Sequence, residues 1–238
     1  MTRITLYAAA GQHGVALMDT SRGRGCWHFL DPVGAQLWLR VTSGTALNEA
    51  IDALTAHWGA SGADSARVRT DLTALAEQLD GAGLLRPARR LAEATAPLGV
   101  RFATQAPIGF FQQLAGGTGL LAALVLLRCF PIRVAITAAR TAARLPGQPA
   151  TIGQAEAVFA AVRRAARWWP GRAACLEESL AAHLAAALTG RRVTWVIGAR
   201  FFPSGAHAWI ETEGYAVGQE PEDRVWPYMP ALKTERSN

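Results

Sequence analysis

The chain has 238 residues, of which 50% are hydrophobic and 18% are charged. This balance is enough to bury a core, and it excludes a disordered, collagen-like or low-complexity chain. At about 150 residues per domain, the length suggests one large domain or two small ones.

The cysteines Cys26, Cys129 and Cys175 stand far apart in the sequence. An odd number at such separations predicts neither a disulfide framework nor a zinc motif of the C-x-x-C type, although it leaves room for one reactive thiol. We therefore expect no metal and no cofactor. The first ten residues contain no uninterrupted apolar stretch of the kind found in secretory signals, which predicts a cytoplasmic protein.

The formal net charge is +6, and arginines are concentrated in the second half of the chain. Between residues 101 and 172 there are nine arginines and one acidic residue, Glu156. Such a stripe attracts anions, whether a nucleic acid, a nucleotide, an acidic peptide or an acidic protein surface. A solvated helix face in an arginine-rich sequence explains the stripe equally well.

The longest apolar run covers residues 114–127 and contains Gly116, Gly117 and Gly119. It is shorter than the roughly 18 residues that a membrane-spanning helix needs. We expect a buried helix or a docking surface here, and no membrane span.

The first 90 residues predict a small α+β module. Residues 3–9, 14–20 and 25–29 contain β-branched or aromatic side chains and are separated by turn residues, which predicts three antiparallel strands. Asp31 is placed to cap a helix with Pro32 in its first turn. Two more helices, over residues 45–58 and from about residue 64 to Gly81, follow from apolar residues spaced by three and four. These elements predict a winged-helix-like domain over residues 1–90.

The composition shifts to alanine, leucine and arginine in the second half, and we expect a linker over residues 91–105 and a second domain over 106–238. Helices are predicted over 110–129, 133–143, 152–166 and 174–188, and strands over 193–197, 208–211 and 215–217. Gly214 is expected at the tip of a hairpin. The whole chain is therefore predicted to be of the α+β class.

Cys175 stands where the last predicted helix begins, directly after the Pro170-Gly171 break. Free amides and the positive end of the helix dipole stabilise a thiolate at such a position and can also bind an oxyanion. His207 follows a glycine turn at the predicted start of a strand, and an imidazole there can take the thiol proton and pass it to a leaving amine. His183 is about two helical turns from Cys175, too far for proton transfer, and is expected on the surface or in packing.

Three motifs mark the second domain: C-L-x-x-S-L-A from Cys175, A-H-A-W-I-E around His207 and G-x-x-V-G from Gly214. They resemble those of the fused B proteins of lasso-peptide biosynthesis, in which a leader-recognition module precedes a papain-like or transglutaminase-like cysteine protease. The resemblance covers residues 168–232 by motif, and the first domain by its three strands and three helices.

This resemblance implies a protein that binds the leader of a precursor peptide, cleaves the leader–core bond and passes the core to an ATP-dependent cyclase. It implies Cys175 as the nucleophile and His207 as the general base and acid. The family's acidic residue, which orients the imidazole, falls at Gln219 in this chain. An amide can orient a histidine but offers no charge to an imidazolium. The third role stays open between Gln219 and the neighbouring Glu220.

In the first domain, the resemblance and the predicted sheet agree on β-augmentation, with the leader added as a strand along residues 25–29. Leu72 and Leu75 on the third helix are equally suited to leader contact and to filling the core of the domain. The charged positions Arg67, Arg69 and Asp71 are candidates for leader selectivity. The candidate leader-binding residues are Trp27, Phe29, Arg67, Val68, Arg69, Leu72 and Leu75.

Other functions compete with this one. A DNA-binding winged helix would place a basic third helix in the major groove, whereas this helix carries more acidic than basic residues, so no nucleic acid is expected as a partner. A transglutaminase-type acyl transferase shares the thioester chemistry, and a non-catalytic peptide-binding scaffold is suggested by Gln219. Residues 114–144 are compatible with docking the cyclase, holding an anionic ligand or covering the protease core.

Overall fold

The computed structural model of the chain describes residues 5–21, 23–90, 99–102, 108–219 and 228–234. It confirms the predicted α+β class, with strands and helices segregated along the chain. The first domain has the three antiparallel strands and three helices that were predicted, and also a short fourth strand that was not predicted and that pairs in parallel with the first strand. Its elements are β1 (Leu6–Gly11), β2 (Gly14–Asp19), β3 (Cys26–Leu30), α1 (Pro32–Thr42), α2 (Leu47–Ala60), α3 (Ser65–Gly81) and β4 (Arg89–Arg90).

Two aspartates start helices of the first domain. The Asp31 carboxylate accepts a hydrogen bond from the Gly34 amide (2.7 Å) at the start of α1, and Asp64 accepts one from Ala66 (2.9 Å) at the start of α3. The sheet has the order β3-β2-β1-β4. Strand β3 therefore lies at an edge of this sheet, because it pairs with β2 alone among the described strands.

The four helices of the second domain lie within one residue of the predicted ranges. Its five-stranded sheet has the order β11-β8-β9-β10-β5, and β6 pairs with β7 beside it. The elements are β5 (Gly99–Phe102), α4 (Phe110–Cys129), α5 (Ile132–Arg144), β6 (Gln148–Pro149), α6 (Ile152–Ala166), α7 (Cys175–Leu188), β7 (Arg191–Arg192), β8 (Thr194–Phe201), β9 (Ser204–Thr212), β10 (Tyr215–Gln219) and β11 (Met229–Lys233).

Two strands of this sheet were absent from the sequence-based prediction. Strand β5 lies inside the segment expected to be a linker and pairs in parallel with β10, and β11 pairs with β8. Both are short, and their partners are distant in sequence or reached through a long connection, so no local pattern marks them. Gly99–Phe102 is thus part of the second sheet.

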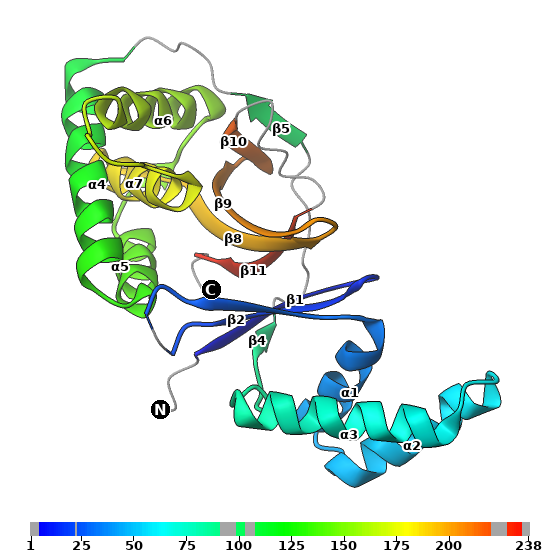
Figure 1. Cartoon of the computed structure of the whole chain (residues 1–238). Coiled ribbons are helices and arrows are strands. Elements are labelled where there is room, and N and C mark those ends of the chain that lie inside the picture. The colour runs from blue at the N-terminus through cyan, green and yellow to red at the C-terminus, as the bar shows by residue number, and fades with distance from the viewer. Residues whose placement is uncertain (1–4, 22, 91–98, 103–107, 220–227, 235–238) are drawn as a thin grey trace.

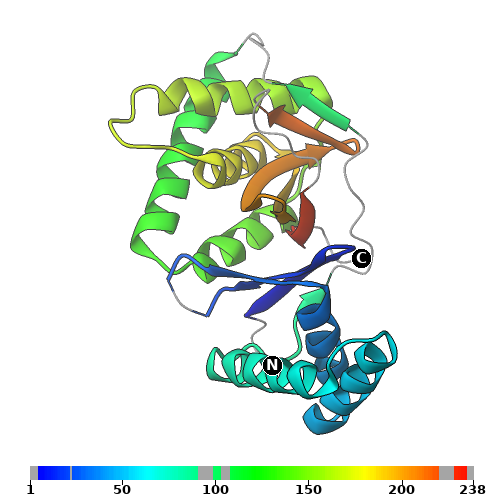
Figure 2. The same cartoon turned by 45° about the vertical axis from the view of Figure 1, so that its right-hand side comes forward.

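The first sheet lies between the α1–α3 helices and the second domain (Figures 1 and 2). Leu6 and Leu17 point to one face and pack with Trp38 of α1. Tyr7 and Met18 point to the other face and belong to the main core of the second domain. This division follows from the two-residue period of a strand. One face of the first sheet therefore shares a hydrophobic core with the second domain, whereas the helices of the first domain have core clusters of their own.

Helix α4 packs one face against α6 and α7 and exposes the other. A Cβ atom on Gly119 would lie 2.5 Å from the Ala181 carbonyl oxygen of α7, so this glycine allows close approach of the two helices. The exposed face carries Phe110, Phe111, Leu114, Leu121 and Val125. By length and composition α4 passes as a candidate membrane span, and 39% of its most apolar 18-residue stretch is buried inside the protein.

Candidate active site

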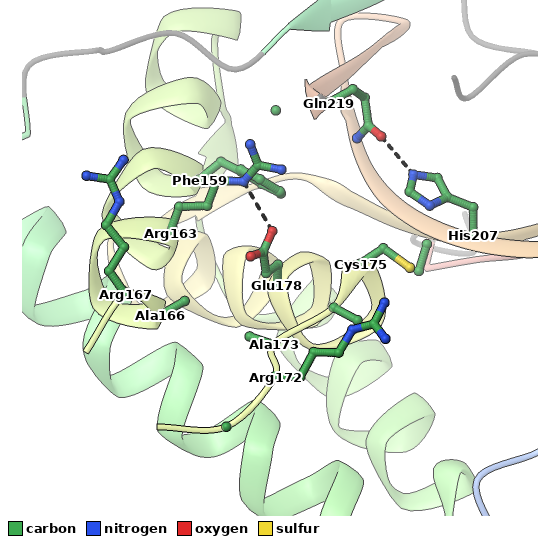
Figure 3. A pocket seen from close by; sticks show the side chains of 14 residues that line it. Phe159, Arg163, Ala166, Arg167, Arg172, Ala173, Cys175, Glu178, His207 and Gln219 are labelled. Carbon is green, nitrogen blue, oxygen red and sulfur yellow. Dashed lines mark hydrogen bonds and ion pairs between the residues drawn. The ribbon is translucent and has the colours of Figure 1, made fainter. Parts of the chain in front are cut away.

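A cavity of about 620 Å³ lies where the start of α7, one face of α6 and the strands β9 and β10 meet (Figure 3). Cys175, His207 and Gln219 all line it, so the structure brings together three of the four residues predicted for catalysis. The fourth, Glu220, lies outside the described residues. Within the described part of the chain, no group of three or more His, Cys, Asp or Glu side chains could hold a metal ion.

Cys175 is the first residue of α7, as the sequence predicts. Ala174 is the preceding cap residue, in an extended conformation, and its amide donates to the Glu177 carboxylate over 3.2 Å. The loop before it is held in place by Arg128, which donates to the Arg172 carbonyl oxygen (3.1 Å) and stacks over the Trp169 ring. The thiol thus lies at the positive end of the helix, beside amides that have no partner within the helix.

His207 lies within β9 and not at its start, because the strand begins at Ser204, before the predicted range. It is opposite Gly198 of β8, and only 7% of the residue is exposed. The ring packs against Trp209 and Tyr228, with centroid distances of 5.9 and 5.3 Å. These contacts fix the plane of the imidazole at the wall of the cavity.

The Gln219 side chain is hydrogen-bonded to His207. Its Oε1 atom lies 2.8 Å from the Nε2 atom of His207, and its own Nε2 donates to the Val217 carbonyl oxygen over 3.1 Å. An amide oxygen only accepts, so the Nε2 atom of His207 carries the proton of this bond. In the neutral imidazole, Nδ1 is then the free base.

A bulge at Gly218 brings Gln219 to this position. Residues 101 and 102 of β5 pair with Val217 and Gln219, so Gly218 is left over and Gln219 turns to the opposite face of the sheet from Val217. His207 lies on that same face. Val217 is opposite Ile210 and shares its face, whereas His207, three residues before Ile210, points to the other side of the sheet. In an unbulged strand the two-residue period would place position 220 there instead. Gly218 has a φ of +76°, and a Cβ there would lie 2.5 Å from the Phe159 ring.

Four charged side chains also line the cavity. Arg163 on α6 and Glu178 on α7 form an ion pair across it, with Nε and Oε2 3.1 Å apart (Figure 3). Arg167 and Arg172 are exposed at its rim. Sequence reasoning noted the arginine stripe but did not place these residues at the site. The spacing of Phe159, Arg163 and Arg167 by four on α6 is the signal that puts them on one face.

A second cavity, of about 350 Å³, lies in the first domain between the starts of α1 and α3 and the end of α2. The predicted residues Val68, Leu72 and Leu75 line it, and Leu72 is also part of the buried core, so both expected roles of Leu72 are compatible with its position. Sequence reasoning missed Trp58, which also lines it. The Trp58 Nε1 atom is buried and has no hydrogen-bond partner among the described residues.

The other residues predicted to bind the leader lie away from this cavity. Trp27 and Phe29 pack against the second domain, and the Phe29 ring meets Phe201 of β8 at a centroid distance of 5.8 Å. The alternation of β3 explains this, because Leu30 faces the helices and side chains at odd positions point the other way. Arg69 pairs with Asp52 of α2 at 2.6 Å, and Arg67 lies 3.9 Å from Asp71.

Comparison with known protein families covers both domains. Residues 118–232 match the model of the transglutaminase-like superfamily, and residues 14–85 match that of coenzyme PQQ synthesis protein D (PqqD). No match was found among curated proteins or solved structures. The two family matches support recognition of a ribosomally made precursor peptide and a peptidase-like role. The chain thus joins a PqqD-type recognition element to a transglutaminase-like domain, which is the architecture of the lasso-peptide B proteins.

Proposed function

We propose that this protein is a leader peptidase of lasso-peptide biosynthesis, with Cys175 as its nucleophile. The observation that carries the proposal is the hydrogen bond from His207 to Gln219 in the cavity that Cys175 lines at the start of α7. It leaves the Nδ1 atom of His207 free to act as a base beside a thiol at a helix N-terminus.

The reaction follows from these groups. The Nδ1 atom of His207 takes the proton of the Cys175 thiol, and the sulfur attacks the carbonyl carbon of the last leader residue. Amides at the start of α7 donate to the oxyanion that forms. The C–N bond then breaks, and the proton on His207 passes to the amine of the core. His207 then takes a proton from water, the oxygen attacks the thioester carbon, the C–S bond breaks, and the proton on His207 returns to the Cys175 sulfur as the leader leaves as a carboxylic acid.

Leader binding is proposed at the edge of β3, where main-chain hydrogen bonds would extend the sheet. The cavity lined by Val68 and Trp58 begins at Asp31, directly after the end of β3. A leader strand that runs past Leu30 therefore meets this cavity and places an apolar side chain in it. The Trp58 Nε1 atom is then available to donate to a leader acceptor.

The direct test of the chemistry is mass spectrometry of the precursor peptide after incubation with the protein, with and without the cyclase and ATP. We expect cleavage at one bond in the wild type and none in Cys175→Ala. Transfer of the acyl group to an amine would establish the acyl transferase instead. Binding without cleavage under every condition would leave a recognition scaffold.

The leader site is tested separately by fluorescence anisotropy with a labelled leader peptide. Val68→Glu places a charge in the cavity without emptying the core, and we expect at least a tenfold loss of affinity, because an unpaired carboxylate resists burial. Arg69→Glu tests separately whether Arg69 contributes to leader selectivity. Its side chain lies on the exposed surface between α2 and α3. Unchanged affinity in a folded Val68→Glu variant would contradict the proposed site.

Transfer of the core to an ATP-dependent cyclase needs a docking surface on this protein. Large hydrophobic side chains are exposed along one face of α4 from Phe110 to Val125, and we propose that this face docks the cyclase. If the cyclase docks here, mixing the two proteins protects the amides of α4 from hydrogen exchange. Unchanged exchange along α4 would leave this face without a role in the transfer.

A further inference from the structure

An ion pair joins the first domain to the helix that carries Cys175. The Nη2 atom of Arg24, in the turn between β2 and β3, lies 2.8 Å from the Oε1 atom of Glu177 in the first turn of α7. The Glu177 side chain is only 7% exposed, whereas that of Arg24 is 60% exposed. A carboxylate at such a position needs a charged partner, and Arg24 supplies it from the other domain.

Glu177 also holds the cap of the helix. Its Oε2 atom accepts the hydrogen bond from the Ala174 amide (3.2 Å), and Ala174 is the residue directly before Cys175. One carboxylate thus contacts Arg24 through one oxygen and the backbone beside the thiol through the other. Movement of this carboxylate would disturb both the cap and the charge around Cys175.

We propose that Arg24 is a positioning residue for Cys175: it holds the Glu177 carboxylate in the helix cap and neutralises its charge beside the sulfur. The proposal rests on the proposed function in taking Cys175 as the nucleophile. It also ties the recognition domain to the active site, because Arg24 precedes the edge strand β3 by two residues.

The turn that carries Arg24 is anchored independently of the ion pair. The Ile132 amide at the start of α5 donates to the Gly23 carbonyl oxygen over 2.9 Å. Gly25 has a φ of +86°, and a Cβ there would lie 3.4 Å from the Ile132 side chain. The backbone of the turn beside Arg24 is therefore anchored to α5, and there is little space around Gly25 for a larger residue.

The charges around Cys175 fit this role. Glu177 and Glu178 are both in the first turn of α7, where the helix dipole favours acidic residues but where unpaired carboxylates would repel a thiolate. Arg24 pairs with Glu177, and Arg163 of α6 pairs with Glu178. Among the described residues, the other charged or titratable groups that line the cavity are His207 and the exposed Arg167 and Arg172.

The test measures the reactivity of the thiol itself. Iodoacetamide alkylation of the full chain is followed over a range of pH by mass spectrometry, which reports the Cys175 peptide apart from that of exposed Cys129. We expect Arg24→Ala to slow alkylation of Cys175 about tenfold at neutral pH. One uncompensated carboxylate within a helical turn, at an intermediate dielectric, raises the energy of the thiolate by an amount of this order. Cys129 should be unaffected.

Two further variants separate charge from structure. Glu177→Gln added to Arg24→Ala removes the uncompensated carboxylate and should restore most of the alkylation rate of Cys175. Arg24→Lys keeps the positive charge and should retain part of that rate. Arg86→Ala is the matched control, because Arg86 pairs with Asp19 at 2.9 Å in the same domain without taking part in the Glu177 pair. We expect Arg86→Ala to leave the Cys175 profile unchanged.

A wild-type rate in Arg24→Ala, or a loss that Glu177→Gln does not reverse, would overturn the proposal. Alkylation needs no peptide substrate, so this result is independent of whether the wild type cleaves a precursor. Failure to cleave would count against the proposed function alone.

Discussion

At the scale of single residues, the site depends on an amide in the place of a carboxylate. Gln219 is 2% exposed and directs the imidazole of His207 through one hydrogen bond, but it brings no negative charge. It fixes the tautomer and orientation of the ring, and in the proposed reaction only the Cys175 thiolate would balance the charge that forms on His207.

We therefore expect Gln219→Ala to lower kcat/KM for precursor cleavage by about 10- to 100-fold, because the imidazole loses its orientation. Gln219→Glu should keep more activity than Gln219→Ala, since a carboxylate also accepts the hydrogen bond. Steady-state kinetics of the two variants at one pH decide this. Equal loss in both would show that the 2.8 Å contact does not orient the base.

The sequence placed His183 either on the surface or in packing, and the structure shows that it is a buried packing residue. Its Nε2 and Nδ1 atoms lie 2.8 Å from the Ala139 carbonyl oxygen and 3.0 Å from that of Val193. Burial lowers the pKa of His183 from its ordinary value of 6.5, although these two hydrogen bonds act in the opposite direction. The folded protein therefore binds a proton at His183 less readily than the unfolded chain does, and the neutral ring donates to only one of the two carbonyl oxygens.

The free energy of unfolding should consequently fall as the pH drops through 6.5 towards the lowered pKa, by at most about 1.4 kcal/mol per pH unit from this group. His183→Gln should flatten that part of the profile, whatever its effect at neutral pH. Urea denaturation between pH 7.5 and 5.5 gives the slope of the free energy of unfolding against pH for the wild type and for His183→Gln. Identical slopes would mean that His183 titrates alike in both states.

At the scale of elements, glycines on α4 set how closely its neighbours pack. A Cβ on Gly119 would collide with backbone of α7, and one on Gly116 would lie 2.8 Å from backbone and side-chain carbons of Ala161 on α6. Gly117, between them, has open space around it. Close packing of α4 therefore requires glycine at positions 116 and 119 but not at position 117.

Gly119→Ala should lower the free energy of unfolding by about 1–3 kcal/mol, because α4 and α7 must move apart. Gly117→Ala should raise it by up to about 1 kcal/mol, because alanine has the higher helix propensity. Chemical denaturation of the two single variants makes each the control for the other. A stable Gly119→Ala variant would show that the helices separate at little cost.

At the scale of the whole molecule, the two domains are coupled by burial as well as by charge. Tyr7 and Met18 of the first sheet lie in the same core cluster as Trp195 and Ile210 of the second. The first sheet therefore has no solvent-exposed apolar face and depends on the second domain to cover it. Such a shared core predicts one cooperative unfolding unit.

Native-state hydrogen exchange tests this cooperativity. Met18→Ala should destabilise the protein by about 2–5 kcal/mol, the range for truncating a buried methionine. Its effect on the most protected amides should be equal in β1 and in β8, although the substitution lies in the first domain. Loss of protection in β1 alone would show that the domains unfold separately.

Local patterns in the sequence were sufficient to predict the helices and two residues of the candidate site. The helices α4–α7 lie within one residue of their predicted ranges because apolar spacing and breaks such as Pro170-Gly171 act over a few residues. Those breaks also placed Cys175 at the start of α7. The helix dipole and the order of Cys175 and His207 then indicated the chemistry.

Features that depend on pairing between distant segments could not be predicted from the sequence. The pairing of β10 with β5, more than 100 residues earlier in the chain, leaves Gly218 as a bulge and puts Gln219 beside His207. The packing of the two domains turned Trp27 and Phe29 towards the second domain and brought Arg24 to Glu177. Register and contacts between domains have no local signal, since they are set by which surfaces are buried together.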